Sequence, residues 1–464
     1  MSAAPFETPS SSPAEVDLRD ASLWQDMHAA TRAWREAHPL AFAPLSGAWF
    51  VLRHADVLRL LGDARLAGGY GTLGEGPSGR VMNGLLANQS GERHARLRRL
   101  VAHAFTPRRI DGMRAALRTR VRSRLAALAP GRALDFQREV ADPLAREAIS
   151  DPLGVPEAEA ATFSGWVAAL LRGQVPTASP AERAAADAAA ASLFAYLAEL
   201  AARRRREPGD SLLDALLAAE DADGGVSAAD LEQVVMSVLA GGTDTVRSFL
   251  GIVTWLLLQR PEARARLAAA PELAPAFVEE ALRFEPPLSG VPRVATEDLA
   301  YHGCVIPAGS PVILGLLSAN RDPRRFPEPD RFEPLRDASA QLSFGRGTHF
   351  CVGAALARME AQELLLGLVA EDTPRLALAE TPRWVPFSPA RRLEALLVKV
   401  AEVKRGRPLS DTPASPPPPP STSSRLSSSP TTRRSSSTRW RKSASRRSPT
   451  RSVRSSRFPS TPGP

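Results

Sequence analysis

Apolar positions repeat with a helical period over most of this chain. The repeat predicts a helix at about 22–36, a series of helices over 106–206, and a long helix at 227–259. Ser227 suits the N-cap of the long helix, because its side-chain oxygen can accept a hydrogen bond from the first turn. A further helix is expected at about 354–369. The fold class is therefore predicted to be mainly α.

Strand patterns are short and confined to a few places. Apolar alternation predicts strands near 48–52 and 300–316, and a turn followed by a strand at 384–400. The segment 68–84 is rich in glycine and has no clear period, so we expect a loop there. These patterns predict small β-sheets beside a helical body.

The two ends of the chain differ in composition from its centre. Residues 1–20 are small, polar and acidic, and they predict a disordered lead. Residues 403–464 consist mainly of Ser, Thr, Arg and Pro, which cannot form a core and predict a disordered basic tail. A frameshifted gene end would produce a similar tail. The folded region is expected at 21–402.

The formal net charge of +9 belongs to the tail and not to the folded region. Residues 401–464 contain 14 Lys and Arg against two acidic residues, whereas residues 1–400 contain 45 basic and 48 acidic residues. The charge therefore does not predict nucleic-acid binding by the folded part. A tail that binds nucleic acid, anionic lipid or an acidic redox partner is an open alternative to a tail without function.

Cysteine content and apolar runs indicate the compartment. Two cysteines exclude a disulfide scaffold and suit a reducing environment. The N-terminal residues lack the apolar centre of a signal peptide, and apolar runs such as 250–258 are too short to span a bilayer. We expect a cytoplasmic protein with no membrane span, in which Cys304 is an inert packing residue.

The other cysteine lies in a glycine-rich loop. The sequence FGRGTHFCVGAALAR places Cys351 directly before a run of helix-forming residues. A sulfur at a helix N-terminus is favoured as a thiolate by the macrodipole and the free N–H groups. A single thiolate cannot build a zinc or iron–sulfur site, but it can be the axial ligand of a haem iron. A buried structural cysteine is the alternative interpretation.

This loop resembles the haem-binding signature of the cytochrome P450 superfamily: phenylalanine, two glycines, histidine, the ligand cysteine and a last glycine. The resemblance implies that Cys351 is the proximal ligand of the iron of haem b, with Phe344 packed near it. His349 would lie close to a haem propionate, and Gly353 leaves room for a flat group. The resemblance also implies the cytochrome P-450 fold, a helical triangular prism with small β-sheets, over 21–402.

Three other basic residues match propionate-binding positions. His94 and Arg98 are one helical turn apart, where both can reach one carboxylate. Taken alone, such a pair is more often a solvated basic helix face. The family has a His-x-x-x-Arg motif that contacts the propionates, and Arg293 matches an arginine with the same role. The residues before His94 depart from the family's Asp-Pro-Pro-Glu lead, so the entry to this helix can differ in shape.

The sequence LAGGTDTVRSFLG lies inside the long predicted helix. Gly241 and Gly242 each cost about 1 kcal/mol relative to alanine, and such a helix usually bends or admits a close neighbour. One interpretation is a kinked core helix with a buried Asp244–Thr245 pair. The motif also resembles the family's oxygen-activating turn, which implies that Thr245 hydrogen-bonds bound oxygen and that Asp244 takes part in proton delivery.

Glu280 and Arg283 are three residues apart on one predicted helix face. By themselves they predict a surface ion pair of small energy. In the family, the Glu-x-x-Arg pair is buried with a further arginine and stabilises the core beneath the haem. Arg331 matches that third partner, so we expect a structural role for all three residues.

Substrate contacts are expected from segments that the family places above the haem. The candidates are Ala240, Gly241, Leu288, Val291 and Phe387. All five are apolar or small, as a pocket for a small organic molecule requires.

The resemblance implies a soluble haem-thiolate monooxygenase that activates O2. It would hydroxylate or epoxidise a small organic molecule, such as a secondary metabolite, a lipid or a terpenoid-like compound. No flavin- or nicotinamide-binding pattern occurs in the sequence, so electrons would come from a ferredoxin or flavodoxin with its reductase. A monomer is expected. A peroxide-driven peroxygenase and a non-catalytic haem-binding protein are the alternatives, and neither requires the Asp–Thr pair.

Overall fold

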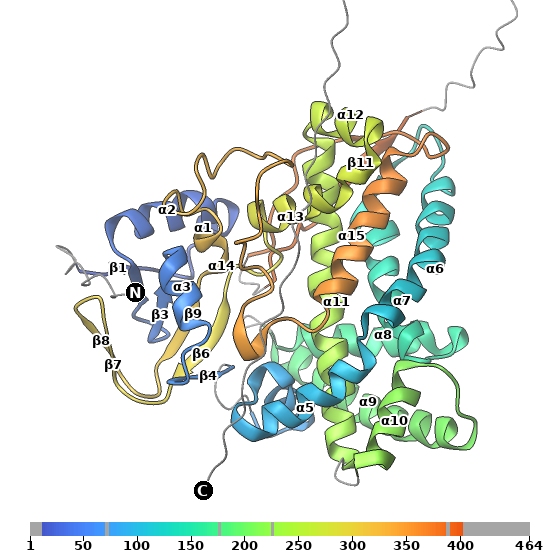
Figure 1. Cartoon of the computed structure of the whole chain (residues 1–464), viewed down its shortest axis with the longest axis horizontal. Helices are drawn as coiled ribbons and strands as arrows, with labels where there is room; N and C mark the ends of the chain where they lie inside the picture. Colours follow the sequence, from blue (N-terminus) through green and yellow to red (C-terminus); the bar gives the residue numbers. More distant parts are fainter. Residues whose placement is uncertain (1–11, 70–73, 175–177, 224–226, 387–389, 402–464) are drawn as a thin grey trace, which may run out of the picture. The chain divides into compact units, whose positions relative to one another are not determined.

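The computed structural model describes residues 12–69, 74–174, 178–223, 227–386 and 390–401. Helices dominate, and the strands are short (Figure 1). The helices are α1 (Ala21–Gln25), α2 (Met27–Ala37), α3 (His54–Leu60), α4 (Pro77–Gly84), α5 (Gly91–Ala104), α6 (Pro107–Ala126), α7 (Asp142–Leu153), α8 (Glu157–Arg172), α9 (Pro180–Arg206), α10 (Leu212–Asp223), α11 (Ala228–Leu258), α12 (Pro261–Ala269), α13 (Ala274–Phe284), α14 (Leu316–Ala319) and α15 (Ala354–Val369). The prediction of a mainly α protein is confirmed.

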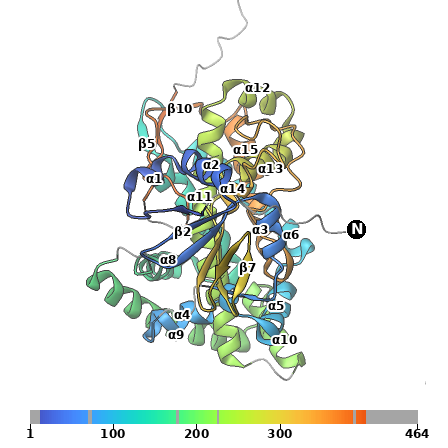
Figure 2. The ribbon, with the colours of Figure 1, turned by 90° about the vertical axis from the view of Figure 1, so that its left-hand side faces the viewer.

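The strands are β1 (Ala14–Glu15), β2 (Leu40–Ala43), β3 (Ala48–Val51), β4 (Leu66–Gly68), β5 (Ala133–Asp135), β6 (Val291–Ala295), β7 (Leu299–Tyr301), β8 (Cys304–Ile306), β9 (Pro311–Leu314), β10 (Leu376–Leu378) and β11 (Leu397–Val400). They form a six-stranded sheet in the order β1-β2-β3-β9-β6-β4, a three-stranded sheet β10-β11-β5, and the hairpin β7-β8. Figure 2 views the molecule from the side of the largest sheet.

The largest sheet contributes to two apolar clusters that are separate from the cluster of the helical core. Val51 of β3 and Val291 of β6 both oppose Leu314 of β9, which is fully buried. This register fixes β6, because a shift by one residue would move the buried Arg293 and Ala295 to the opposite face of the sheet. The sheet thereby holds Val291 and Arg293 at the edge of the cavity described below.

Helix α11 runs through the helical core, with α7, α13 and α15 packed against it (Figure 1). Ser227 caps it as predicted: its side chain accepts a hydrogen bond from Asp230 N, and the Asp230 side chain accepts one from Ser227 N. The helix continues without interruption through both glycines. A Cβ on Gly242 would lie 2.5 Å from Ile149 Cδ1 of α7, so this glycine admits a close neighbour and does not break the helix.

Three local predictions are wrong. The segment 68–84 contains α4, whose N-terminus is capped from α9: Ser78 N and Oγ donate to Asp187 Oδ1 at 3.0 and 2.6 Å. The stretch 106–206 contains β5, which forms because it pairs with β11. Residues 12–20 of the expected disordered lead include β1, which pairs with β2, and Val16, which is buried. In each case the stabilising partner is distant in sequence.

Among the described residues, α9 is long and apolar enough to cross a membrane. A single such helix is weak evidence for a span, because core helices of soluble proteins meet the same criterion. α9 packs against α4 and α8 and buries several of its alanines and leucines. The absence of a membrane span stays a prediction, as does the disorder of the tail, which lies outside the described residues.

Candidate active site

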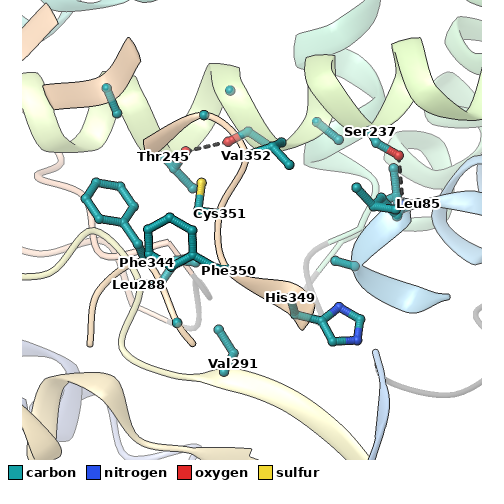
Figure 3. Close-up of a pocket in the computed structure, with 18 of the residues that line it drawn as sticks. Leu85, Ser237, Thr245, Leu288, Val291, Phe344, His349, Phe350, Cys351 and Val352 are labelled. Atoms are coloured by element: carbon teal, nitrogen blue, oxygen red, sulfur yellow. Dashed lines mark hydrogen bonds between the residues drawn. The ribbon is translucent and has the colours of Figure 1, made fainter. Parts of the chain in front are cut away.

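A cavity of about 450 Å³ lies between α11, the loop before α15 and the segment that follows α13 (Figure 3). Most side chains around it are apolar. The predicted site residues that line it are His94, Arg98, Ala240, Gly241, Thr245, Leu288, Val291, Arg293, Phe344, His349, Cys351 and Gly353. Segments separated by up to about 260 residues thus meet at one place. Phe387 lies outside the described residues.

The Cys351 loop is shaped by two glycines in the left-handed region. Gly345 and Gly347 have φ of 68° and 69°, a backbone conformation that residues with a Cβ atom rarely adopt. The turn brings Cys351 N to 2.9 Å from Phe344 O and makes Gly353 the N-cap of α15. The sulfur lies at a helix N-terminus, as predicted, and points into the cavity toward α11 (Figure 3).

Opposing effects act on the pKa of the Cys351 thiol, and the expected preference for the thiolate stays a prediction. Burial raises the pKa of the thiol, and this effect exceeds the lowering by the Gly353 N–H, Arg98 and Arg358. A coordinated metal ion would favour the thiolate, because a thiol bound to a metal is deprotonated.

Four cationic or hydrogen-bond-donating groups gather at one side of the cavity. The rings of His94 and His349 are 4.2 Å apart. Burial and the nearby Arg293, His94 and Arg98 lower the pKa of His349 to about 4. Burial, Arg98 and Arg293 also lower the pKa of His94, and burial lowers the pKa of Arg293. A positive charge on one of these groups therefore disfavours a positive charge on its neighbours.

This cluster has unmet hydrogen-bonding capacity. His94 is buried, and its Nε2 has no hydrogen-bond partner among the described residues. Arg293 Nη1 donates only to the carbonyl of the adjacent Pro292 in the part of the chain that the structure describes. Buried donors that repel one another require an anion nearby. The two propionates of haem b would provide it, with Cys351 placed to bind the iron, so the residues fit this cofactor.

The catalytic candidates on α11 occupy different environments. Thr245 lines the cavity, and its Oγ1 donates a hydrogen bond to Gly241 O at 2.5 Å. Asp244 does not line the cavity. Its carboxylate pairs with Arg247 and, at 3.5 Å, with Arg392. The structure therefore brings only Thr245 to the cavity, and the catalytic roles of both residues remain predictions.

Glu280 and Arg283 form a buried ion pair as expected, but its third partner is not the one predicted. Glu280 and Arg283 are fully buried and joined by two hydrogen bonds of 2.7 and 2.8 Å. The side chain of Arg331 is 64% exposed and pairs with Glu328 and Glu333 instead. Arg336 takes its place, with Nε 3.4 Å from Glu280 Oε1. The backbone carbonyl of Arg331 still accepts from Arg283, which keeps Arg331 near the pair but turns its side chain outward.

Several cavity residues were missed from the sequence. Helical spacing could have identified Ser237 and Phe249 of α11, because they lie four residues before Gly241 and four residues after Thr245. Phe350 adjoins the cysteine and has no periodic signal. The missed residues include Leu85, Ser237, Phe249, Pro287, Phe350 and Leu356.

Sequence comparison identifies relatives along most of the chain. The model for the cytochrome P450 family matches residues 180–371. The chain is 37% identical over 371 residues to vitamin D(3) 25-hydroxylase of Pseudonocardia autotrophica, covering 78% of this chain and 90% of that protein. It is 36% identical over 378 residues to mycinamicin IV hydroxylase/epoxidase of Micromonospora griseorubida, covering 78% of this chain and 94% of that protein.

Solved structures show the same fold. CalO2 is similar with a TM-score of 0.78 and 30% identity, covering 84% of this chain and 99% of that one. Epothilone B-bound cytochrome P450epoK is similar with a TM-score of 0.77 and 31% identity, covering 83% of this chain and 99% of that one. The predicted cytochrome P-450 fold is confirmed.

The fold, the cysteine at the start of α15 and the donor cluster define a haem-thiolate protein. The chain belongs to the cytochrome P450 family. It is accordingly a monooxygenase that uses haem b as cofactor and O2 as co-substrate, and that acts on a small organic molecule.

Proposed function

We propose that this enzyme hydroxylates or epoxidises a bulky, mainly apolar secondary metabolite or lipid-like compound. The observation that carries the proposal is a cavity that both Cys351 and Thr245 line and whose other side chains are mostly apolar. The relatives named above act on vitamin D3 and mycinamicin IV, and a similar structure binds epothilone B. These molecules are large and have extended apolar surfaces.

Different residues around the cavity would have different roles. Haem, when bound, supplies oxygen activation and electron transfer. Cys351 would bind its iron, and His94, Arg98, Arg293 and His349 would hold its propionates. The apolar lining orients the substrate by contact and excludes water. Thr245 holds a hydroxyl proton at the cavity surface, and Asp244, one residue before it, is fixed by two arginines on the other side of α11.

The reaction requires a separate electron donor. Two electrons and two protons reduce one atom of O2 to water, while the other atom enters a C–H or C=C bond of the substrate. We assign the electrons to a ferredoxin or flavodoxin with its reductase, and we expect a monomer in the cytoplasm. Activity that requires hydrogen peroxide and does not respond to a reductase would indicate the peroxygenase alternative.

The first test is the absorption spectrum of the dithionite-reduced protein with carbon monoxide. A strongly red-shifted Soret band that disappears in Cys351→Ala is expected for thiolate-ligated haem. Substrate turnover with reductase and O2 would follow, with Thr245→Ala releasing the consumed O2 as peroxide or water without product. A Soret band that persists without Cys351 would refute the site, and unchanged coupling in Thr245→Ala would favour a non-catalytic or peroxide-driven protein.

A further inference from the structure

Two chain segments join beside the cavity, and one of them lines it. Pro287 and Leu288, which follow α13, line the cavity, and Figure 3 shows the Leu288 side chain there. Leu288 forms an isolated β-bridge with Ala390, and Arg391 N donates to Pro287 O at 2.8 Å. We call Pro287 and Leu288 the cavity wall. The position of the cavity wall depends on the position of residues 390–391, because the bridge and the hydrogen bond join the two segments.

A buried carboxylate lies directly before this wall. Glu285, the C-cap of α13, has a side chain that is 5% exposed. Its Oε1 is 2.8 Å from His28 Nε2 of α2, and its Oε2 accepts a hydrogen bond from Arg391 Nη2 at 3.1 Å. Arg321 Nη2 is 3.8 Å from the same carboxylate. Burial would raise the pKa of Glu285, but His28, Arg391 and Arg321 together lower it, so the carboxylate is ionised.

Arg391 is itself held from several directions. Its guanidinium lies 3.9 Å from the ring centre of Trp384, and its side chain is 4% exposed. Gln25 of α1 fixes Trp384 by two backbone hydrogen bonds, of 2.8 Å to its carbonyl and 3.1 Å from its N–H. The N-terminal helices therefore contact both Glu285 and the segment that carries Arg391. A buried arginine with its carboxylate removed would be left uncompensated and would move.

We propose that Glu285 is a positioning residue that, through Arg391 and His28, sets the place of the cavity wall and so determines which substrates fit. The ion pair joins the two segments next to the cavity, and none of its members lines the cavity. Its effect on the substrate must therefore act through Pro287 and Leu288. This inference rests on the proposed function, because it requires the substrate to lie beside Leu288.

The test compares two iron-binding probes of different size in the haem-loaded protein. Imidazole and 4-phenylimidazole both bind haem iron and shift the Soret band, and the added phenyl group makes the second probe more dependent on the space beside the cavity wall. The variant is Glu285→Gln, which keeps the shape and removes the charge. The matched control is Glu363→Gln, since Glu363 is also fully buried and accepts hydrogen bonds from two arginines, Arg114 and Arg118, while joining α15 to α6.

In Glu285→Gln the affinity for 4-phenylimidazole should fall about tenfold or more, because a displaced wall misplaces the phenyl group. The affinity for imidazole should stay within about twofold, as should both affinities in Glu363→Gln. Equal loss for both probes, no loss, or the same selective loss in the control would overturn the inference.

His28→Asn provides an independent variant that keeps the Glu285–Arg391 pair. We expect a selective loss of 4-phenylimidazole affinity of about threefold, and this variant decides the question if Glu285→Gln does not retain haem. Equal retention of both probes in His28→Asn would then count against the inference. If the wild-type protein lacks the red-shifted carbon monoxide band, the proposed function itself is refuted. This spectrum does not depend on Glu285, so it distinguishes that failure from a failure of the inference.

Discussion

Replacing Arg283 with methionine should destabilise the protein more than any other single arginine substitution near the site. Arg283 is fully buried and donates to Glu280 twice, and to the carbonyls of Asn320 and Pro329 at 3.0 and 2.9 Å. Removing one member of a buried ion pair costs about 3–5 kcal/mol. Glu280 would be left with the longer contact to Arg336 and the hydrogen bond from Glu333 N, which do not replace the two short bonds from Arg283. Since a domain is stable by about 5–15 kcal/mol, this cost is a large share of the total.

Two neighbouring arginines are the controls. Arg336→Met should cost about 1–3 kcal/mol, because its side chain is 14% exposed and donates to Glu280 and to backbone carbonyls. Arg331→Met should cost about 0–1 kcal/mol, because its ion pairs of 3.5 and 3.6 Å are at the surface. Urea unfolding followed by circular dichroism, at equal haem occupancy, measures all three. A loss in Arg331→Met equal to that in Arg336→Met would refute the reasoning.

Three further predictions follow from the structure. Burial raises the pKa of Glu360 well above its usual range, so above about pH 4.5 this residue ionises in the unfolded chain and stays protonated in the folded protein, which lowers stability as pH rises. Glu360→Gln should remove this contribution, so its urea midpoint should gain more over that of the wild type at pH 7 than at pH 4. The same difference in midpoint at both pH values would contradict the prediction. Gly241→Ala should keep the fold because a Cβ there meets no atom within 4 Å, whereas Gly242→Ala should lower the free energy of unfolding by about 1–3 kcal/mol through its contact with Ile149. Deleting 403–464 should leave the reduced carbon monoxide spectrum unchanged, and loss of the Soret band would assign the tail a role in haem binding.

The amino-acid sequence determined the helical class, the long central helix and the placement of Cys351, the proposed haem ligand, directly before a helix. These depend on local signals: the apolar period, the Ser227 cap, and glycines at 345 and 347 that permit the turn before Cys351. Such signals involve residues close together in the chain, so no distant partner is needed to interpret them. The motif resemblance then located twelve of the residues that line the cavity.

Tertiary structure alone decided the features that depend on distant partners. Helix α4 forms where Asp187 caps it, and the chain at Arg331 turns its side chain outward so that Arg336 reaches Glu280. Burial raises the pKa of the Cys351 thiol, against the lowering by the Gly353 N–H, Arg98 and Arg358. The carboxylate of Glu285 also meets its partners only after folding. Desolvation and long-range contacts have no signature in a local stretch of sequence, and they set the charge and the final position of these groups.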